Sequence, residues 1–129
     1  MITLSFLKLL EDNNFGVIDT DLFFQKLTLD KKGIYIADIG DGLTRGQRRT
    51  QSFELYARGK NDTDGYKQLS DILDFLRDSY SGVCELPPVP PISTKEYTNV
   101  TILPTSTITN VGLDANNRII YSITGQIIY

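Results

Sequence analysis

The spacing of apolar side chains is most regular between Asn61 and Gly82, where they recur at steps of three and four positions. This spacing places them on one stripe of an α-helix. Asp62 and Asp64 supply capping oxygens and favourable negative charge at the start, and Gly82 lies just past the end. We therefore predict an amphipathic helix with a buried stripe that consists of Tyr66, Leu69, Ile72, Leu73, Leu76 and Tyr80.

A shorter apolar face occurs between Thr3 and Asp12, which predicts a second helix with either Thr3 or Ser5 as its capping residue. Asparagines and a glycine follow from residue 13 onward and end it. The next segment, up to residue 33, shows no clear period. We predict an irregular connection there that buries Leu22, Phe23 and Phe24.

Two stretches in the middle of the chain favour β-structure. Residues 34–39 are β-branched or aromatic for the most part, and "TQSFELYARG" alternates polar residues with Phe53, Leu55 and Ala57. The glycine-rich segment from Gly40 to Gln51 lies between them, and we predict a long hairpin loop. Farther on, "VCEL" is a short strand candidate, "PPVPP" is an extended connector, and the last third predicts two or three strands.

This order of elements is helix, two strands, helix, and then two or three strands. It predicts one α+β domain over residues 1–129, with a mainly antiparallel sheet of four to five strands and both helices packed on one face. The length of 129 residues and the apolar fraction of 40% are sufficient for a hydrophobic core.

The composition excludes several kinds of catalytic and metal site. The chain has one cysteine, Cys84, and no histidine, so an intrachain disulfide, a zinc cluster and any Ser-His or Cys-His pair are ruled out. Asp19, Asp21, Asp38 and Asp41 could in principle form a magnesium or acid-base site, although their spacing does not bring them to one point. We expect a protein that is not an enzyme and uses no cofactor.

The N-terminal residues lack the pattern of a secretory signal, and no run approaches the ~20 apolar residues of a membrane span. We expect a soluble, intracellular protein that does not contact a membrane. The formal net charge is −3, which argues against a dedicated nucleic-acid binder.

Three arginines nevertheless gather in "GDGLTRGQRRTQ": Arg45, Arg48 and Arg49. They could contact nucleic-acid phosphates, pair with carboxylates of a neighbouring subunit, or remain solvated. The end of the final predicted strand, Ile127, Ile128 and Tyr129, is a second candidate contact. Sheet edges rich in threonine, isoleucine and tyrosine invite pairing with another chain, so we predict self-assembly there.

The succession "FGVIDTDLFF", "GIYI", "RGQRRTQSFELYARGKNDTDGYKQL", "GVCELP" and "NVTILPTSTITNVGLDANNRIIYSITG" resembles the siphophage minor capsid proteins that act as tail terminators. The resemblance covers nearly the whole chain. Its most specific part is the junction from "TQSFELYARG" to "DGYKQL", followed by "GVCELP".

The resemblance implies a small α+β virion protein without catalytic residues. It would form a homo-oligomeric ring, typically of six subunits, that caps the tail tube protein, stops tube elongation and joins the tail to a head-neck connector protein. The protein would be made in the cytoplasm of the bacterial host and reside at the head-tail junction, with DNA passing through its lumen. A head-completion or neck protein of the same machine, and a small phage nucleic-acid-binding module, remain the alternatives.

Overall fold

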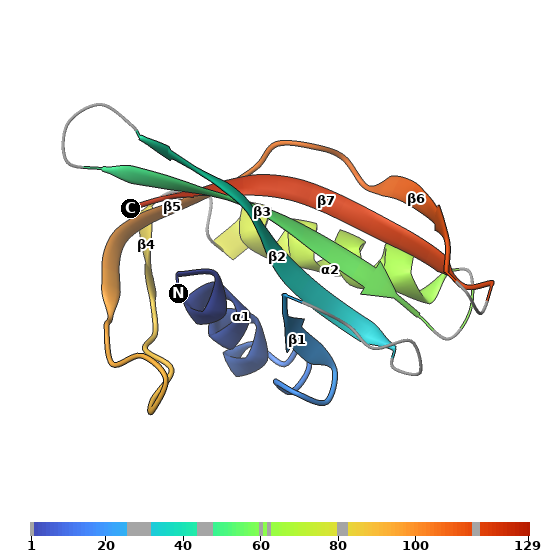
Figure 1. Cartoon of the computed structure of the whole chain (residues 1–129), viewed down its shortest axis with the longest axis horizontal. Helices are drawn as coiled ribbons and strands as arrows, with labels where there is room; N and C mark the ends of the chain where they lie inside the picture. The colour runs from blue at the N-terminus through green and yellow to red at the C-terminus, as the bar shows by residue number, and fades with distance from the viewer. Residues whose placement is uncertain are drawn as a thin grey trace.

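The computed structural model describes residues 2–25, 32–43, 48–59, 61, 63–79, 83–114 and 117–129. Within these ranges the chain forms two helices and seven strands (Figure 1). In chain order they are α1 (Ile2–Asp12), β1 (Leu22–Phe24), β2 (Gly33–Leu43), β3 (Arg49–Arg58), α2 (Asp64–Ser79), β4 (Val83–Leu86), β5 (Tyr97–Pro104), β6 (Thr109–Leu113) and β7 (Ile119–Ile128).

The strands form one mixed sheet in the order β1-β2-β3-β7-β5-β4, and β6 pairs with β7 beyond the end of β5. β1 runs parallel to β2, whereas the other pairs are antiparallel. The broad α+β class agrees with the sequence-based expectation. The expected count of four to five strands was too low, because the described residues form seven. The segment expected to be irregular contains β1, whose parallel pairing with β2 also makes the sheet mixed.

The segment expected to be a long hairpin loop is mostly β-structure. β2 continues to Leu43 and β3 begins at Arg49, and these two residues are paired. A β-bulge between Asp38 and Gly40 shifts the register, and Gly40 has a φ of 142°, which a side chain would disfavour. Gly40 therefore bends a continuing strand instead of ending it.

Helix α1 is buried on nearly every side. It contacts β1, β2, β3 and β4, and Figure 1 shows it inside the curl of the sheet. The Phe6 ring lies 5.2 Å from the Phe53 ring of β3, centroid to centroid. The expected capping role of Thr3 or Ser5 is wrong: the helix already begins at Ile2, and both hydroxyl groups are buried without a hydrogen-bond partner.

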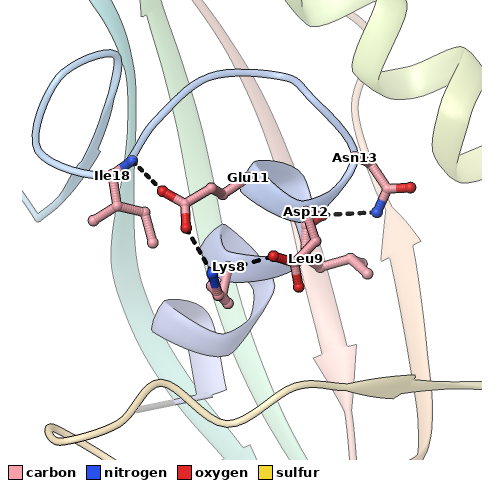
Figure 2. Close-up of polar contacts among 6 residues, drawn as sticks. All are labelled: Lys8, Leu9, Glu11, Asp12, Asn13 and Ile18. Carbon is pink, nitrogen blue, oxygen red and sulfur yellow. Dashed lines mark hydrogen bonds and ion pairs between the residues drawn. The ribbon is translucent and has the colours of Figure 1, made fainter.

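Polar contacts hold the turn that follows α1 (Figure 2). The Glu11 carboxylate accepts a hydrogen bond from Lys8 Nζ at 2.7 Å and another from the backbone N–H of Ile18, also at 2.7 Å. The Asn13 side-chain amide donates to the Leu9 carbonyl at 2.8 Å. The last turn of the helix and the segment leading to β1 are thereby tied together.

Asn61, which was not among the caps expected from the sequence, caps the start of α2. Asn61 Oδ1 accepts hydrogen bonds from the backbone N–H groups of Thr63 and Asp64, at 3.0 and 3.1 Å. Asp62 lies outside the described residues. This arrangement satisfies two of the otherwise unpaired donors of the first turn.

The apolar stripe of α2 is confirmed only in its centre. Leu69, Ile72 and Leu76 are buried, whereas Tyr66 is 51% exposed. Tyr66 packs edge-on against Tyr121 of β7, with ring centroids 5.6 Å apart. Leu73 is half-buried, and Tyr80 lies outside the described residues.

Both helices cover the same face of the sheet. Phe53, Leu55 and Ala57 alternate along β3 toward that face, as the sequence predicted, and join the α1 and α2 side chains in one apolar cluster. The opposite face carries polar side chains such as Glu54 and Tyr56. The functional surfaces described below lie on this polar face and at one end of the strands.

Candidate functional site

One end of the sheet gathers cations and tyrosines from three separate parts of the chain. We call this surface the arginine–tyrosine end, and it consists of Arg48, Arg49, Lys95, Tyr97 and Tyr129. It exists because the last residue of the chain pairs with the first residue of β3. The Arg49 N–H donates to the Tyr129 carbonyl at 2.6 Å, and the Tyr129 N–H donates to the Arg49 carbonyl at 2.9 Å.

The side chains at this end form a row in which two tyrosine rings lie between two cations. The Arg49 guanidinium carbon lies 5.9 Å from the centre of the Tyr129 ring. The Tyr129 and Tyr97 rings meet edge to face at 5.6 Å and 89°. Lys95 Nζ lies 5.0 Å from the centre of the Tyr97 ring. Such contacts hold charged and aromatic groups in place while leaving part of each side chain exposed.

Both tyrosines at this end are half-buried, and Arg48, Arg49 and Lys95 are exposed. Burial raises the pKa of the Tyr97 phenol, with a smaller contribution in the same direction from Tyr129, while Arg49 acts against it. The phenol therefore keeps its proton at neutral pH and can donate a hydrogen bond. The arginine–tyrosine end presents positive charge and phenolic donors together.

The structure brings some of the sequence-predicted site residues together and separates others. Arg49 lies beside Tyr129, and Arg48 is the exposed residue just before it, whereas Arg45 lies outside the described residues. Ile127 is fully buried in the core, and Ile128 is half-buried opposite Thr50.

The final strand is also not an open edge. β7 pairs with β3 on one side and with β5 and β6 on the other. This strand therefore offers no free edge over the paired residues, and a subunit contact through the exposed parts of Ile128 and Tyr129 stays a prediction. Its apolar, β-branched sequence reflects its central position in the sheet.

Sequence reasoning missed Lys95 and Tyr97. Tyr97 is the first residue of β5, and Lys95 lies two positions before it. Tyr97 reaches Tyr129 because β5 pairs with the end of β7, with Thr101 opposite Ile128. That register is a long-range property of the sheet. The motif "KEY" gave no local signal of it.

A second group of tyrosines lies on the polar face of the sheet. Tyr35 of β2 and Tyr56 of β3 stack with ring centroids 4.6 Å apart and an interplanar angle of 11°. The Tyr56 hydroxyl donates to Glu54 at 2.6 Å. Burial, followed by this hydrogen bond, raises the pKa of Tyr56, and burial also raises the pKa of Tyr35. Neither phenol is prepared to act as a base.

A buried ion cluster joins the turn between β6 and β7 to the end of β3. Asp114 Oδ2 lies 3.3 Å from Arg58 Nη1 and 3.0 Å from Arg118 Nε. The Asp114 and Arg58 side chains are 4% and 5% exposed. The carboxylate also accepts the backbone N–H of Arg118 at 2.9 Å. These interactions fix the turn and satisfy the Asp114 carboxylate with three partners. We therefore assign the cluster a role in stability.

The loop aspartates do not form a metal site within the described ranges. Asp38 exchanges hydrogen bonds with Gln25, and the Asp21 carboxylate accepts the backbone N–H of Val17. No group of three or more acidic or cysteine side chains that could hold a metal ion occurs among the described residues. Cys84 is half-buried, and burial raises the pKa of its thiol.

No helix in the described ranges is both long enough and apolar enough to cross a membrane. Chemically, the arginine–tyrosine end is suited to binding rather than to bond making, because it combines fixed cations with aromatic surface. It is the candidate functional site on these grounds. No protein-family model matches the chain, and no curated protein matches it either.

Proposed function

We propose that the chain is a structural protein of a phage virion, a tail terminator that forms a homo-oligomeric ring on the tail tube, stops its elongation and joins it to the head. The resemblance of its motifs to siphophage tail terminators suggests this role. The observation that carries it is the arginine–tyrosine end, where Arg49 lies beside Tyr129 and the exposed Arg48 precedes it in the chain.

Arginine and tyrosine are enriched in protein interfaces, because each combines a large contact area with hydrogen-bonding groups. The row from Arg49 through Tyr129 and Tyr97 to Lys95 places such side chains on one continuous surface. The geometry is largely preformed by backbone pairing, which reduces the entropy lost on binding. A rigid contact surface of this kind suits a subunit that must dock on a tube or connector.

We propose that the partner at this end presents carboxylates, which pair with arginine through two parallel hydrogen bonds. DNA in the lumen is the less suitable partner. An electropositive lining would retain a nucleic acid that must move freely when the phage ejects its genome. Contact with an acidic surface of the tail tube or neck protein avoids this conflict.

The test is electron microscopy of lysates from a phage that carries this gene, with the gene deleted. Filled heads beside unjoined, over-long tail tubes are the expected result. Tails of normal length beside empty or leaking heads would instead assign a head-completion role. Intact virions would overturn the structural proposal altogether.

A second test addresses the arginine–tyrosine end itself. Replacing Arg45, Arg48 and Arg49 by alanine together should lower virion yield while the circular dichroism spectrum and thermal midpoint stay close to those of the parent. Arg77→Ala is the matched control, because Arg77 is an exposed arginine on α2 whose side chain pairs with Asp74 and Asp78. A normal yield from the triple variant would contradict the proposal for this surface.

The same exposed cations and rings could bind a single nucleic-acid strand, with bases stacked on tyrosine. This alternative predicts binding of free nucleic acid that weakens steeply as salt rises. Fluorescence anisotropy with labelled single- and double-stranded oligonucleotides at low salt distinguishes the two. The terminator proposal expects that the parent and the triple variant do not differ in nucleic-acid binding. Binding by the parent that the triple variant has lost would favour the nucleic-acid alternative.

A further inference from the structure

Strand β6 is an edge strand with an exposed, uncharged sequence. It pairs with β7 alone among the described strands, and all five of its residues are exposed. Val111 and Leu113 are 53% and 63% exposed. Natural edge strands usually carry a charge or a proline that prevents pairing with another chain. The sequence of β6, TNVGL, contains neither.

The opposite edge of the same sheet is also open over part of its length. β1 pairs only with residues 34–36 of β2, and the Gln25 side chain accepts the backbone N–H of Asp38. From Gly40 to Leu43, β2 pairs with β3 alone within the described residues, and Ile39 is the bulged residue before this stretch. Ile39 is 51% exposed at the bulge.

The strand directions make these two edges complementary. β2, β3, β7 and β6 are joined by three successive antiparallel pairings, so β6 runs antiparallel to β2. A second copy placed beside the first in the same orientation would therefore add its β2 to β6 as an antiparallel neighbour. The other edge strand on this side is β4, which is joined to β7 through β5 by two antiparallel pairings and so runs parallel to β2. If β2 of the second copy lay beside β4, the two strands would form the less stable parallel pair.

We propose that copies of this chain associate head to tail, with β6 of one copy pairing with Ile39–Leu43 of the next. The occupant is a second copy because the two edges match each other: each is a stretch of five residues with no neighbouring strand on its outer side among the described residues, and their strand directions are complementary. This inference deepens the proposed ring and rests on it.

The contact is heterologous, because two different surfaces meet. Such contacts generate closed rings when the rotation between neighbours closes, and open filaments when it does not. β6 lies beside the first residues of β7, whereas the open part of β2 lies at the other end of the sheet (Figure 1). Each copy would consequently be displaced along the strand direction relative to its neighbour.

Cysteine cross-linking of the full chain tests the pairing. Two variants are made in a Cys84→Ala background, one with Ile39→Cys and the other with Val111→Cys. The two proteins are mixed and oxidised at a series of protein concentrations up to the solubility limit. The expected product is a disulfide dimer that forms in the mixture, and a ladder of higher species from the chain that carries both substitutions. Ile92→Cys with Val111→Cys is the matched control, because Ile92 is 65% exposed but lies outside both edges.

Two outcomes would overturn the proposal. A dimer formed equally well by Val111→Cys alone would mean that β6 pairs with itself about a two-fold axis. No product beyond the control at any concentration would mean that these edges do not meet. Val111→Lys provides an independent measurement: sedimentation velocity should show loss of the oligomer with the monomer still folded, whereas Val111→Thr should preserve it.

The outcomes of the proposed function and of this inference can be separated. Cross-linking together with intact virions from the gene deletion would retain the pairing and reject the terminator role. Unjoined tails from the deletion together with no cross-link would reject the pairing and retain the terminator role.

Discussion

Arg58 Nη1 lies 3.3 Å from Asp114 Oδ2, and both side chains are almost completely buried. The pair joins the end of β3 to the turn between β6 and β7, where Arg118 adds a second contact with the same carboxylate. Buried ions of this kind stabilise a fold only while all partners remain, because each is costly to leave alone. This carboxylate therefore helps to fix β6 relative to β3, in addition to the pairing of both strands with β7.

Removing that carboxylate should destabilise the protein strongly. We expect Asp114→Ala to lower the free energy of unfolding by about 3–5 kcal/mol, because it leaves buried arginine charge without its partner. Asp114→Asn, which keeps the volume, should cost nearly as much. Urea denaturation measures both. Asp71→Ala, which breaks the exposed Asp71–Lys67 pair on α2, is the control and should change little.

Deleting a buried hydroxyl in α1 should have the opposite effect. Ser5 Oγ is buried without a hydrogen-bond partner, so Ser5→Ala removes an unsatisfied polar atom and introduces a better helix former. We expect the free energy of unfolding to rise by about 1 kcal/mol. Thr3→Val, which has the same shape, should act in the same direction.

Ser5→Ala combines two effects, the loss of an unsatisfied hydroxyl and a gain in helix propensity. Ser70→Ala in α2 measures the gain in helix propensity at a half-buried helical position. Ser5→Ala should exceed its effect in the same chemical denaturation experiment. A loss of stability on Ser5→Ala would show that the hydroxyl is hydrogen-bonded in solution.

The Glu11 carboxylate should make stability depend on pH in the acid range. Its hydrogen bond to Lys8, followed by the one from the Ile18 backbone, lowers the pKa of Glu11 from its ordinary 4.5. A lowered pKa in the folded state means that the contribution is complete above 4.5 and is lost as pH falls through the lowered value. Since the side chains are partly exposed, the contribution should stay below about 1 kcal/mol.

Glu11→Gln should therefore be less stable than the parent at neutral pH, and the two should converge in acid. Thermal unfolding between pH 2 and 7 measures the difference. Glu85→Gln is the control, because Glu85 is exposed on β4. A difference that stays constant down to the lowest pH would contradict the assignment.

Gly125 lies directly opposite Phe53 on the core face, and its missing side chain makes room for the ring. A Cβ atom added at Gly125 would lie 2.6 Å from Phe53 Cζ and 2.9 Å from the Leu103 carbonyl oxygen. We expect Gly125→Ala to cost about 1–3 kcal/mol through overpacking. Adding Phe53→Leu should recover part of the loss, which a double-mutant cycle would show as coupling. Additive effects would mean that the ring is not the obstacle.

The sequence correctly predicted those elements in which the spacing of apolar residues matches the residues that are buried in the structure. The centre of α2 and the alternation along β3 are examples, because Leu69 and Leu55 report the core through sequence spacing alone. The ends of α2 were less predictable. Tyr66 fits the apolar stripe in sequence, yet it lies at the first turn, where the ring reaches the margin of β7 and remains half exposed.

The extension of β2 could not be predicted from its own residues. Gly40, Asp41 and Gly42 disfavour strands, but pairing with β3 holds them in one. The parallel pair of β1 is three residues long and gave no period.

The candidate site was half visible in the sequence. Arg49 and Tyr129 were each singled out, but only the register of β3, β7 and β5 brings them together and adds Tyr97. Long-range strand pairing carries this information, and it has no local signature.

The enclosure of α1 has a consequence for how the chain reaches its native state. The helix comes early in the sequence, but β3 and β4, which help to cover it, follow many residues later. Because α1 has apolar residues around most of its circumference, the segments next to it in the sequence cannot bury all of them. Native contacts of high sequence separation slow folding, so α1 must stay exposed until the sheet closes over it. Folding of this chain should be limited by the closure of the sheet, with the first helix among the last elements to become protected from hydrogen exchange.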